Sequence, residues 1–312
     1  MRAAVLCALC VLRLPAQGPF RAETRVVEIP VTVTAEGRNV DGLTARDFRV
    51  LDDGAVRTVT LDTFGTGIAP ISLVMAVQTS GLSTPALAKI RRIGSLIQPL
   101  VIGGRGEAAI LVFDNQVDWV RPFTSDPSAL QSAVRKLRAG KSTQGRLLDA
   151  VVEAARALRG RKGRKVLLVV SESRDRGSAA KLMEALEAVE RGGVEVFATP
   201  YSASAAAWLA RPEDLPPPSG PNFMAVFDEL LRLGRTNHVQ ALAQASGGSE
   251  YPFLRERSLE KAVETFAAEV NSQYILAFPQ PDGAASGMHR IEVSVPSRPG
   301  AAVRARRAYW SE

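Results

Sequence analysis

The chain has 312 residues, 46% of them apolar and 23% charged, and carries a formal net charge of +7. A chain of this length and composition suits one or two ordinary globular domains. Its only cysteines, Cys7 and Cys10, lie in an N-terminal segment that we expect to be removed. Disulfides, cysteine nucleophiles and cysteine-based zinc sites are therefore excluded from the mature protein.

Residues 1–16 have the pattern of a secretory signal peptide. A basic start at Arg2 is followed by a short apolar core over residues 3–12, and Pro15 and Ala16 precede the expected cleavage site. The apolar run is too short for a membrane-spanning helix, which needs about 20 apolar residues. We therefore expect an exported protein, periplasmic or extracellular, with no transmembrane segment.

Alternating apolar and polar residues at both ends of the chain predict antiparallel strands. Residues 25–34 alternate cleanly, and Pro30 suggests that this strand lies at a sheet edge. The Asp53-Gly54 pair between apolar residues 48–51 and 56–61 predicts a hairpin, and residues 288–295 and 303–310 alternate again. We infer that residues 24–66 and 273–312 together form one small β-sandwich-like domain.

Between these ends, residues 67–272 alternate strands with helices, which is typical of a doubly wound, Rossmann-like α/β sheet. The first strand, residues 71–77, is apolar apart from Ser72 and is predicted to be buried on both faces. Ser83 is the expected N-cap of the helix that follows. Further strands are predicted over residues 108–113, 117–120, 166–170 and 194–199. Further helices are predicted from residue 126 and over residues 146–158, 178–191, 223–233, 239–245 and 259–270.

The loop Gln78-Thr79-Ser80-Gly81 follows the first strand, at the carboxyl edge where open α/β sheets bind ligands. This segment resembles the first strand and metal loop of a von Willebrand factor type A (VWA) domain, and more narrowly the VWA-related family of secreted bacterial proteins. The stretches GLTARDFRVLDDG and VRARRAYW resemble that family's flanking elements. The likeness implies a VWA-like domain, with residues 117–120 as an antiparallel edge strand, inserted in the β domain.

The family's metal-ion-dependent adhesion site consists of Asp-x-Ser-x-Ser in this loop, a Thr in a later loop and an Asp after the fourth strand. Only Ser80 is kept in register here. The other family positions are occupied by Gln78 (first Asp), Leu82 (second Ser), Gly145 (Thr) and Glu172 (late Asp).

The resemblance therefore implies a degenerate site for Mg²⁺ or Mn²⁺, whose candidate ligands are Ser80, Glu172, the carbonyl of Gln78, and Thr143 or Ser142 if their loop shifts. Because Gln78 is neutral where the family has a carboxylate, we expect such an ion to bind weakly or not at all. In the metal-free alternative, Ser80 caps the helix, Gln78 bonds to neighbouring loop backbone, and Glu172 is solvated or pairs with Arg174.

We predict that the protein is not an enzyme. His238 and His289 are the only histidines, and both are expected to be structural. Asp149 and Glu172 could form a pair of carboxylates for general acid/base catalysis. However, packing and loop hydrogen bonds are enough to explain why an Asp stands at position 149. The glycine-rich residues 103–106 precede a strand instead of following one, unlike a dinucleotide fingerprint.

Basic residues gather over 156–165 and 304–307. We expect them to lie in solvated loops and at strand edges. Alternatively, they form a surface patch that binds anionic envelope lipid or polysaccharide. Nucleic acid is not expected as a partner, because aromatic residues are not interleaved with the basic ones.

Residues 201–221 are rich in Ala, Ser and Pro and follow the fifth predicted strand, at the same edge of the sheet as the Ser80 loop. We expect them to form a flexible surface loop or, alternatively, a loop over the ligand-binding edge that sets selectivity.

Together these features predict an exported VWA-like binding protein that engages a protein partner or an envelope polysaccharide at the carboxyl edge of its α/β sheet. The main alternative is a structural or scaffold protein of the envelope, without metal, that meets anionic polymers through basic surfaces. A hydrolase with a weak metal site is the third hypothesis. The sequence predicts neither the identity of the partner nor the oligomeric state.

Overall fold

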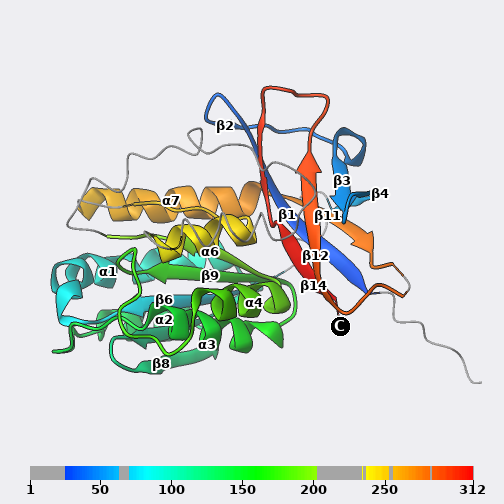
Figure 1. Ribbon diagram of the computed structural model, residues 1–312. Helices are drawn as coiled ribbons and strands as arrows, with labels where there is room; N and C mark the ends of the chain where they lie inside the picture. The colour runs from blue at the N-terminus through cyan, green and yellow to red at the C-terminus, as the bar shows by residue number, and fades with distance from the viewer. Residues whose placement is uncertain are drawn as a thin grey trace, which may run out of the picture.

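The computed structural model describes residues 25–62, 70–201, 234, 237–252, 256–281 and 283–311. The predicted signal peptide, the predicted helix over 223–233 and residues 202–221 lie outside the described residues. The described chain forms an α/β unit and, beside it, a pair of antiparallel sheets (Figure 1). None of the described helices is long and apolar enough to cross a membrane.

The α/β unit is built on one five-stranded sheet with the order β10-β9-β6-β7-β8. Its strands are β6 Ile71–Gln78, β7 Glu107–Phe113, β8 Val117–Thr124, β9 Arg164–Val170 and β10 Val194–Ala198. All pairings are parallel except that of β8, the predicted antiparallel edge strand. The central strand β6 is buried along its whole length, as its apolar sequence predicts.

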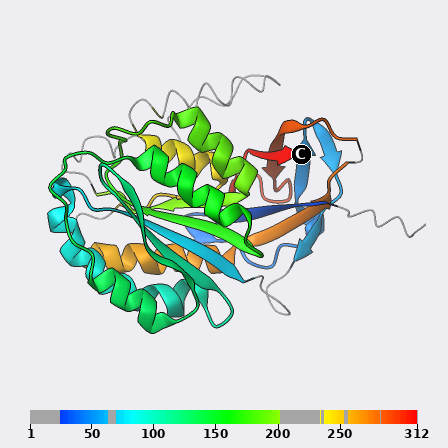
Figure 2. The same ribbon diagram turned by 90° about the horizontal axis from the view of Figure 1, so that it is seen from below.

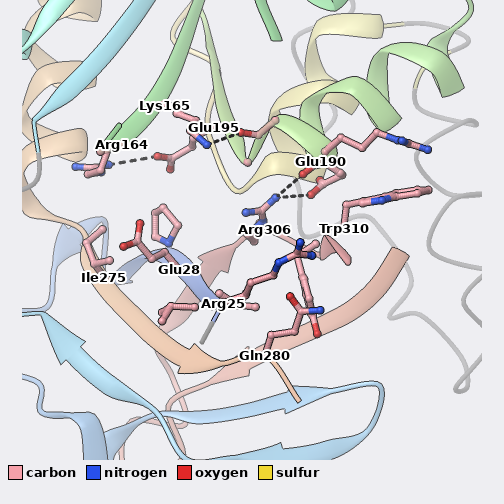
Figure 3. Close-up of a pocket in the computed structure, with 18 residues that line it drawn as sticks. Arg25, Glu28, Arg164, Lys165, Glu190, Glu195, Ile275, Gln280, Arg306 and Trp310 are labelled. Atoms are coloured by element: carbon pink, nitrogen blue, oxygen red, sulfur yellow. Dashed lines mark hydrogen bonds and ion pairs between the residues drawn. The ribbon is translucent and has the colours of Figure 1, made fainter. Parts of the chain in front are cut away.

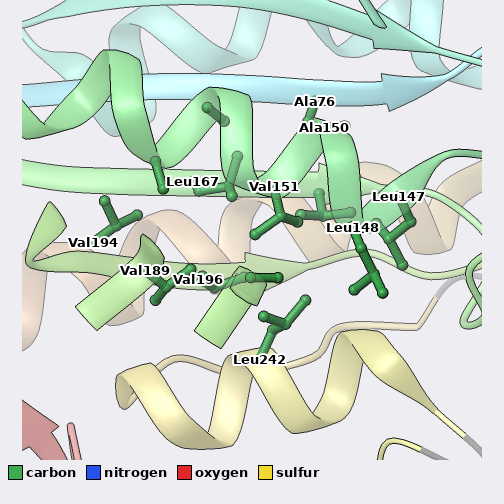
Figure 4. Packing of buried hydrophobic residues seen from close by; sticks show 14 of the residues in the cluster. Ala76, Leu147, Leu148, Ala150, Val151, Leu167, Val189, Val194, Val196 and Leu242 are labelled. Carbon is green, nitrogen blue, oxygen red and sulfur yellow. The ribbon is translucent and has the colours of Figure 1, made fainter. Parts of the chain in front are cut away.

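Helices cover both faces of this sheet (Figure 2). One face carries α3 Leu147–Arg159, α4 Leu182–Gly192 and α6 His238–Ser246. The other carries α1 Thr84–Ile97, α2 Pro127–Arg135 and α7 Glu256–Ser272, with the short helices η2 Gly81–Ser83 and η3 Gln98–Ile102 on either side of α1. Figure 4 shows the first face, where Val151, Val189 and Leu242 from the three helices pack over Leu167 and Val196.

Both ends of the chain contribute to the two antiparallel sheets. One has the order β13-β1-β11-β5, with β2 paired to β1, and the other has the order β14-β12-β3-β4. Their strands are β1 Val26–Ala35, β2 Arg38–Asn39, β3 Arg49–Asp52, β4 Ala55–Arg57, β5 Thr60–Asp62, β11 Tyr274–Pro279, β12 Gly287–Ser294, β13 Ala302–Ala305 and β14 Ala308–Ser311, and η1 Ala45–Asp47 precedes β3. One apolar cluster joins Ile29 of the first sheet to Val50 and Ile291 of the second. The β-sandwich-like arrangement and the domain boundaries stay predictions.

The hairpin at Asp53-Gly54 is confirmed: β3 and β4 pair antiparallel, and the two turn residues have φ angles of +48° and +83°. Two other predictions are wrong. The predicted strands over 56–61 and 303–310 each split into two strands that belong to different sheets. Pro30 does not mark an edge strand, because β1 lies between β11 and β13; β13 joins β1 only from Val31 onward, beyond the proline.

Buried ion pairs line the junction between the α/β unit and the antiparallel sheets, around a pocket of about 380 Å³ (Figure 3). Arg164 of β9 lies 3.3 Å from Glu195 of β10. Arg306, between β13 and β14, lies 2.8 Å from Glu190 of α4. Several cations of the two basic runs therefore point inward instead of forming a solvated patch.

Candidate functional site

Three loops meet at the carboxyl edge of the α/β sheet, as the strand order requires. They are the loop after β6, the segment over 140–146 that precedes α3, and the loop after β9. Backbone hydrogen bonds join them: Gly81 N donates to Ser142 O at 2.7 Å, and Gly145 and Arg176 exchange two bonds of 2.9 Å. The predicted site residues therefore lie on neighbouring loops.

The side-chain amide of Gln78 links two of these loops. Gln78 is 1% exposed at the end of β6. Its Nε2 donates to Ser80 Oγ at 2.9 Å, and its Oε1 accepts from Glu172 N at 2.9 Å. Because a backbone N–H can only donate, the oxygen of the amide must face Glu172 and the NH₂ group must face Ser80. The expected bond from Gln78 to loop backbone is thus confirmed.

A row of hydroxyl groups continues the network away from Gln78. Ser80 and Ser83 are fully buried, and their Oγ atoms lie 3.3 Å apart. The Tyr201 hydroxyl donates to Ser83 Oγ at 2.6 Å, and burial raises the pKa of Tyr201, so this end of the network is neutral. Ser80 precedes η2 but makes no side-chain capping bond. The expectation that Ser80 caps the helix is wrong, because its hydroxyl is engaged by Gln78.

Gly145 provides the space that the Gln78 amide occupies. A Cβ atom at Gly145 would lie 2.6 Å from Gln78 Nε2, which is closer than such atoms approach. The backbone of Gly145 lies outside the left-handed region, so space and not backbone conformation requires glycine here. Gly145 and Gln78 are therefore matched in shape; the resemblance described above aligns them with the family's Thr and first Asp.

Thr143 and Glu172 lie at the rim of the network. The Thr143 side chain is exposed. The Glu172 carboxylate lies 3.3 Å from Arg176 Nε, whereas the sequence suggested Arg174 as its partner. The structure thus brings Gln78, Ser80 and the backbone of Glu172 into direct contact, and it places Thr143 at the surface.

These residues do not fit a tightly held divalent cation. Mg²⁺ and Mn²⁺ need several oxygen ligands and negative charge. Here the NH₂ group of Gln78 faces Ser80 Oγ, its carbonyl oxygen accepts from a backbone N–H, and the Glu172 carboxylate lies beside Arg176. The weak or absent metal binding inferred from the sequence stays a prediction, and this geometry supports it.

The loop hydrogen bonds expected around Asp149 are confirmed, whereas the contact of Tyr201 with Ser83 was not predicted from the sequence. The Asp149 carboxylate lies 2.7 Å from Arg146 and accepts hydrogen bonds from Ala180 N at 2.8 Å and Ala179 N at 3.1 Å. It therefore orders the chain before α4. The match of Gln78 with Gly145 did leave a signal, because both residues depart from the family pattern at positions that the fold brings together.

No family model matches this chain, and no curated protein matches it. Solved structures do match. A von Willebrand factor type A protein from Catenulispora acidiphila superimposes with a TM-score of 0.50 at 12% identity, covering 94% of this chain and 76% of that one. Proximal thread matrix protein 1 from the mussel byssus matches with a TM-score of 0.50 at 10% identity, covering 71% and 50%. BatB from Bacteroides thetaiotaomicron matches with a TM-score of 0.46 at 16% identity, covering 64% and 98%. With its parallel sheet, antiparallel edge strand and converging loops, this chain has a VWA-like α/β fold.

Proposed function

We propose that this chain is an exported binding protein that engages a protein partner through the carboxyl edge of its VWA-like sheet, with a degenerate metal site. Export is inferred from the signal-peptide pattern of residues 1–16. In the degenerate site, the amide of Gln78 joins two loops that a cation joins in the family.

The observation that carries this proposal is the contrast between the buried network and its rim. Gln78, Ser80 and Ser83 are buried and hydrogen-bonded to one another, so the loops are held in place. The exposed residues around them are polar and largely basic, namely Lys141, Thr143, Gln144, Arg174 and Arg176. In the family a partner carboxylate completes the coordination of the metal. A cationic rim can receive an acidic group directly, through charge-assisted hydrogen bonds.

The metal part of the proposal is tested by thermal unfolding of the metal-stripped protein in EDTA and in millimolar Mg²⁺. We expect the two curves to coincide. A ligand at 100 times its dissociation constant that binds only the folded protein adds about 2.7 kcal/mol to the free energy of unfolding, a shift of several degrees. Such a shift in the parent protein, lost in Ser80→Ala, would contradict the proposal.

The partner is tested by photo-crosslinking in the native host. A photoreactive residue is placed at Thr143 on the rim or, as a control, at exposed Lys162, which precedes β9 at the opposite edge of the sheet. We expect one protein to crosslink at position 143 and not at 162, with no effect of EDTA, and Arg176→Glu to abolish the product. Equal crosslinking at both positions would contradict this proposal.

The alternative, a scaffold that meets anionic envelope polymers through basic surfaces, is supported by the exposed cations Arg156, Arg159, Arg161 and Lys162. It is weakened by the engagement of Arg304 with Glu269 and of Arg306 with Glu190. Salt-sensitive binding to many polyanions, lost when Arg156 and Arg159 are replaced by Gln, would favour it. A hydrolase is the least supported, because Asp149 and Glu172 both have structural contacts.

A further inference from the structure

A second cluster of potential ligands lies in the antiparallel sheets, far in sequence from the carboxyl-edge loops. Asp52 ends β3, Asp53 is the first turn residue of the β3–β4 hairpin, and His289 lies on β12, which pairs with β3. One ligand atom from each of the three side chains lies within 4.8 Å of the other two. The cluster therefore joins the N-terminal and C-terminal parts of the chain.

In each of the three side chains, one polar atom bonds to a residue outside the cluster. His289 Nε2 lies 2.8 Å from Ala285 O. Asp53 Oδ1 accepts from Arg290 N at 2.8 Å, and Asp52 Oδ2 accepts from Arg57 Nε at 2.9 Å. Outer contacts of this kind orient the ligands of protein metal sites, where a histidine typically donates its second N–H to a backbone carbonyl.

Of the remaining atoms, two bond to each other and one, Asp52 Oδ1, has no partner in the described part of the chain. His289 Nδ1 lies 2.8 Å from Asp53 Oδ2. A nitrogen and an oxygen that are both about 2.1 Å from one tetrahedral ion lie about 3.4 Å apart, so this pair has to open by about 0.6 Å to hold an ion. Asp52 is 1% exposed, and its Oδ1 has no hydrogen-bond partner in the described part of the chain. A buried carboxylate oxygen without a partner is unfavourable, and a cation would satisfy it.

We propose that Asp52, Asp53 and His289 bind one divalent transition-metal ion of the Zn²⁺ class. One imidazole and two carboxylates suit Zn²⁺ better than Mg²⁺, which prefers oxygen ligands alone. The ion takes the place of the proton between His289 Nδ1 and Asp53 Oδ2. The Asp53 side chain is 54% exposed, so solvent can supply a further ligand. The ring of Tyr309 stacks on the imidazole of His289, with the ring centroids 5.0 Å apart.

The test is calorimetric titration of the metal-stripped full chain with Zn²⁺. Cys7 and Cys10 are replaced by Ser in every protein tested, because a Cys-x-x-Cys pair can bind Zn²⁺ by itself. We expect one Zn²⁺ per chain, and a loss of affinity of more than about tenfold in His289→Gln and in Asp53→Asn. The matched control is His238→Gln, which changes the other histidine and should leave the affinity unchanged.

Two results would overturn the proposal: no binding of Zn²⁺ by the parent chain, or equal affinity in His289→Gln and His238→Gln. A second measurement covers the case in which His289→Gln does not fold. In the parent chain, paramagnetic Co²⁺ should broaden the ring NMR signals of His289 and not those of His238. Broadening of His238 instead, or of neither ring, would also contradict the site.

Discussion

Gln78 and Gly145 illustrate how two residues far apart in the sequence depend on each other. The buried amide of Gln78 fills the space beside Gly145 and bonds to Ser80 and to the backbone of Glu172. Taken alone, Gln78 in place of the family's Asp, or Gly145 in place of its Thr, indicates only the loss of a metal ligand. Together they form a neutral, hydrogen-bonded contact between two loops, because an uncharged amide needs no counter-charge when it is buried and its bonds are made.

We predict that Gly145→Ala destabilises the protein by about 1 to 3 kcal/mol, the usual cost of overpacking. The added methyl group would meet Gln78 Nε2 at 2.6 Å and displace a bonded amide. Urea unfolding of a double-mutant cycle checks this. In a Gln78→Ala background the same change should cost little, since the space is then open. Equal costs in both backgrounds would show that the contact does not matter.

A second residue-scale prediction concerns Glu250. Burial raises the pKa of Glu250 to about 7, although a hydrogen bond from Asn237 opposes the shift. The folded protein therefore keeps this proton at a higher pH than the unfolded chain does. The free energy of unfolding should fall as pH rises from about 4.5 to 7 and then level off.

Glu250→Gln is neutral at every pH and should remove the part of this fall that Glu250 contributes. We expect the variant to be more stable than the parent protein by roughly 3 kcal/mol above pH 7, with the difference vanishing below about pH 4.5. Thermal or urea unfolding across this range measures it. Exposed Glu264→Gln on α7 is the control for loss of one surface charge. A difference that grows toward acidic pH would contradict the sign.

At the scale of single elements, α4 begins at Leu182, four residues later than the sequence pattern predicts. The Asp149 carboxylate accepts from the backbone of Ala179 and Ala180, and Asp175 accepts from Ser178 N. These bonds hold residues 178–180 in a non-helical path. Helical periodicity is a local signal, and here side chains from other elements override it.

We predict that Asp149→Ala costs about 1 to 3 kcal/mol, because a charged acceptor of two backbone N–H groups is lost. The matched control is Glu153→Ala, one turn later on α3, whose carboxylate accepts from exposed Trp119 Nε1. That change should cost less than about 0.5 kcal/mol. Urea unfolding compares the two, and hydrogen exchange at residues 179 and 180 should rise only in Asp149→Ala. Equal costs would contradict the role of Asp149.

At the scale of the whole molecule, ion pairs join the α/β unit to the antiparallel sheets. Arg306 lies against Glu190 of α4, and Arg304 lies against Glu269 of α7. Burial raises the pKa of Glu190, and the charge of Arg306 opposes that shift. The basic run over 304–307 therefore serves the internal contact between the two units (Figure 3).

We predict that Arg306→Met destabilises the chain by about 3 to 5 kcal/mol, because Glu190 is left buried without its partner. The double variant Glu190→Leu/Arg306→Met should recover most of this loss, since no unpaired charge remains. Urea unfolding followed by circular dichroism measures both. If the double variant is no more stable than Arg306→Met, the loss comes from packing and not from the unpaired carboxylate.

By itself, the sequence determined the alternation of strands and helices in the described part of the α/β unit, the buried central strand and the Asp53-Gly54 hairpin. These features follow from local periodicity and turn chemistry, which neighbouring residues carry among themselves. The resemblance to VWA domains added the antiparallel edge strand. Only the tertiary structure decided where β1 lies in its sheet, the split of β4 from β5, the fit of Gln78 to Gly145, and the meeting of Asp52 and Asp53 with His289. Each of these depends on space and partners supplied by residues distant in the chain, which no local pattern encodes.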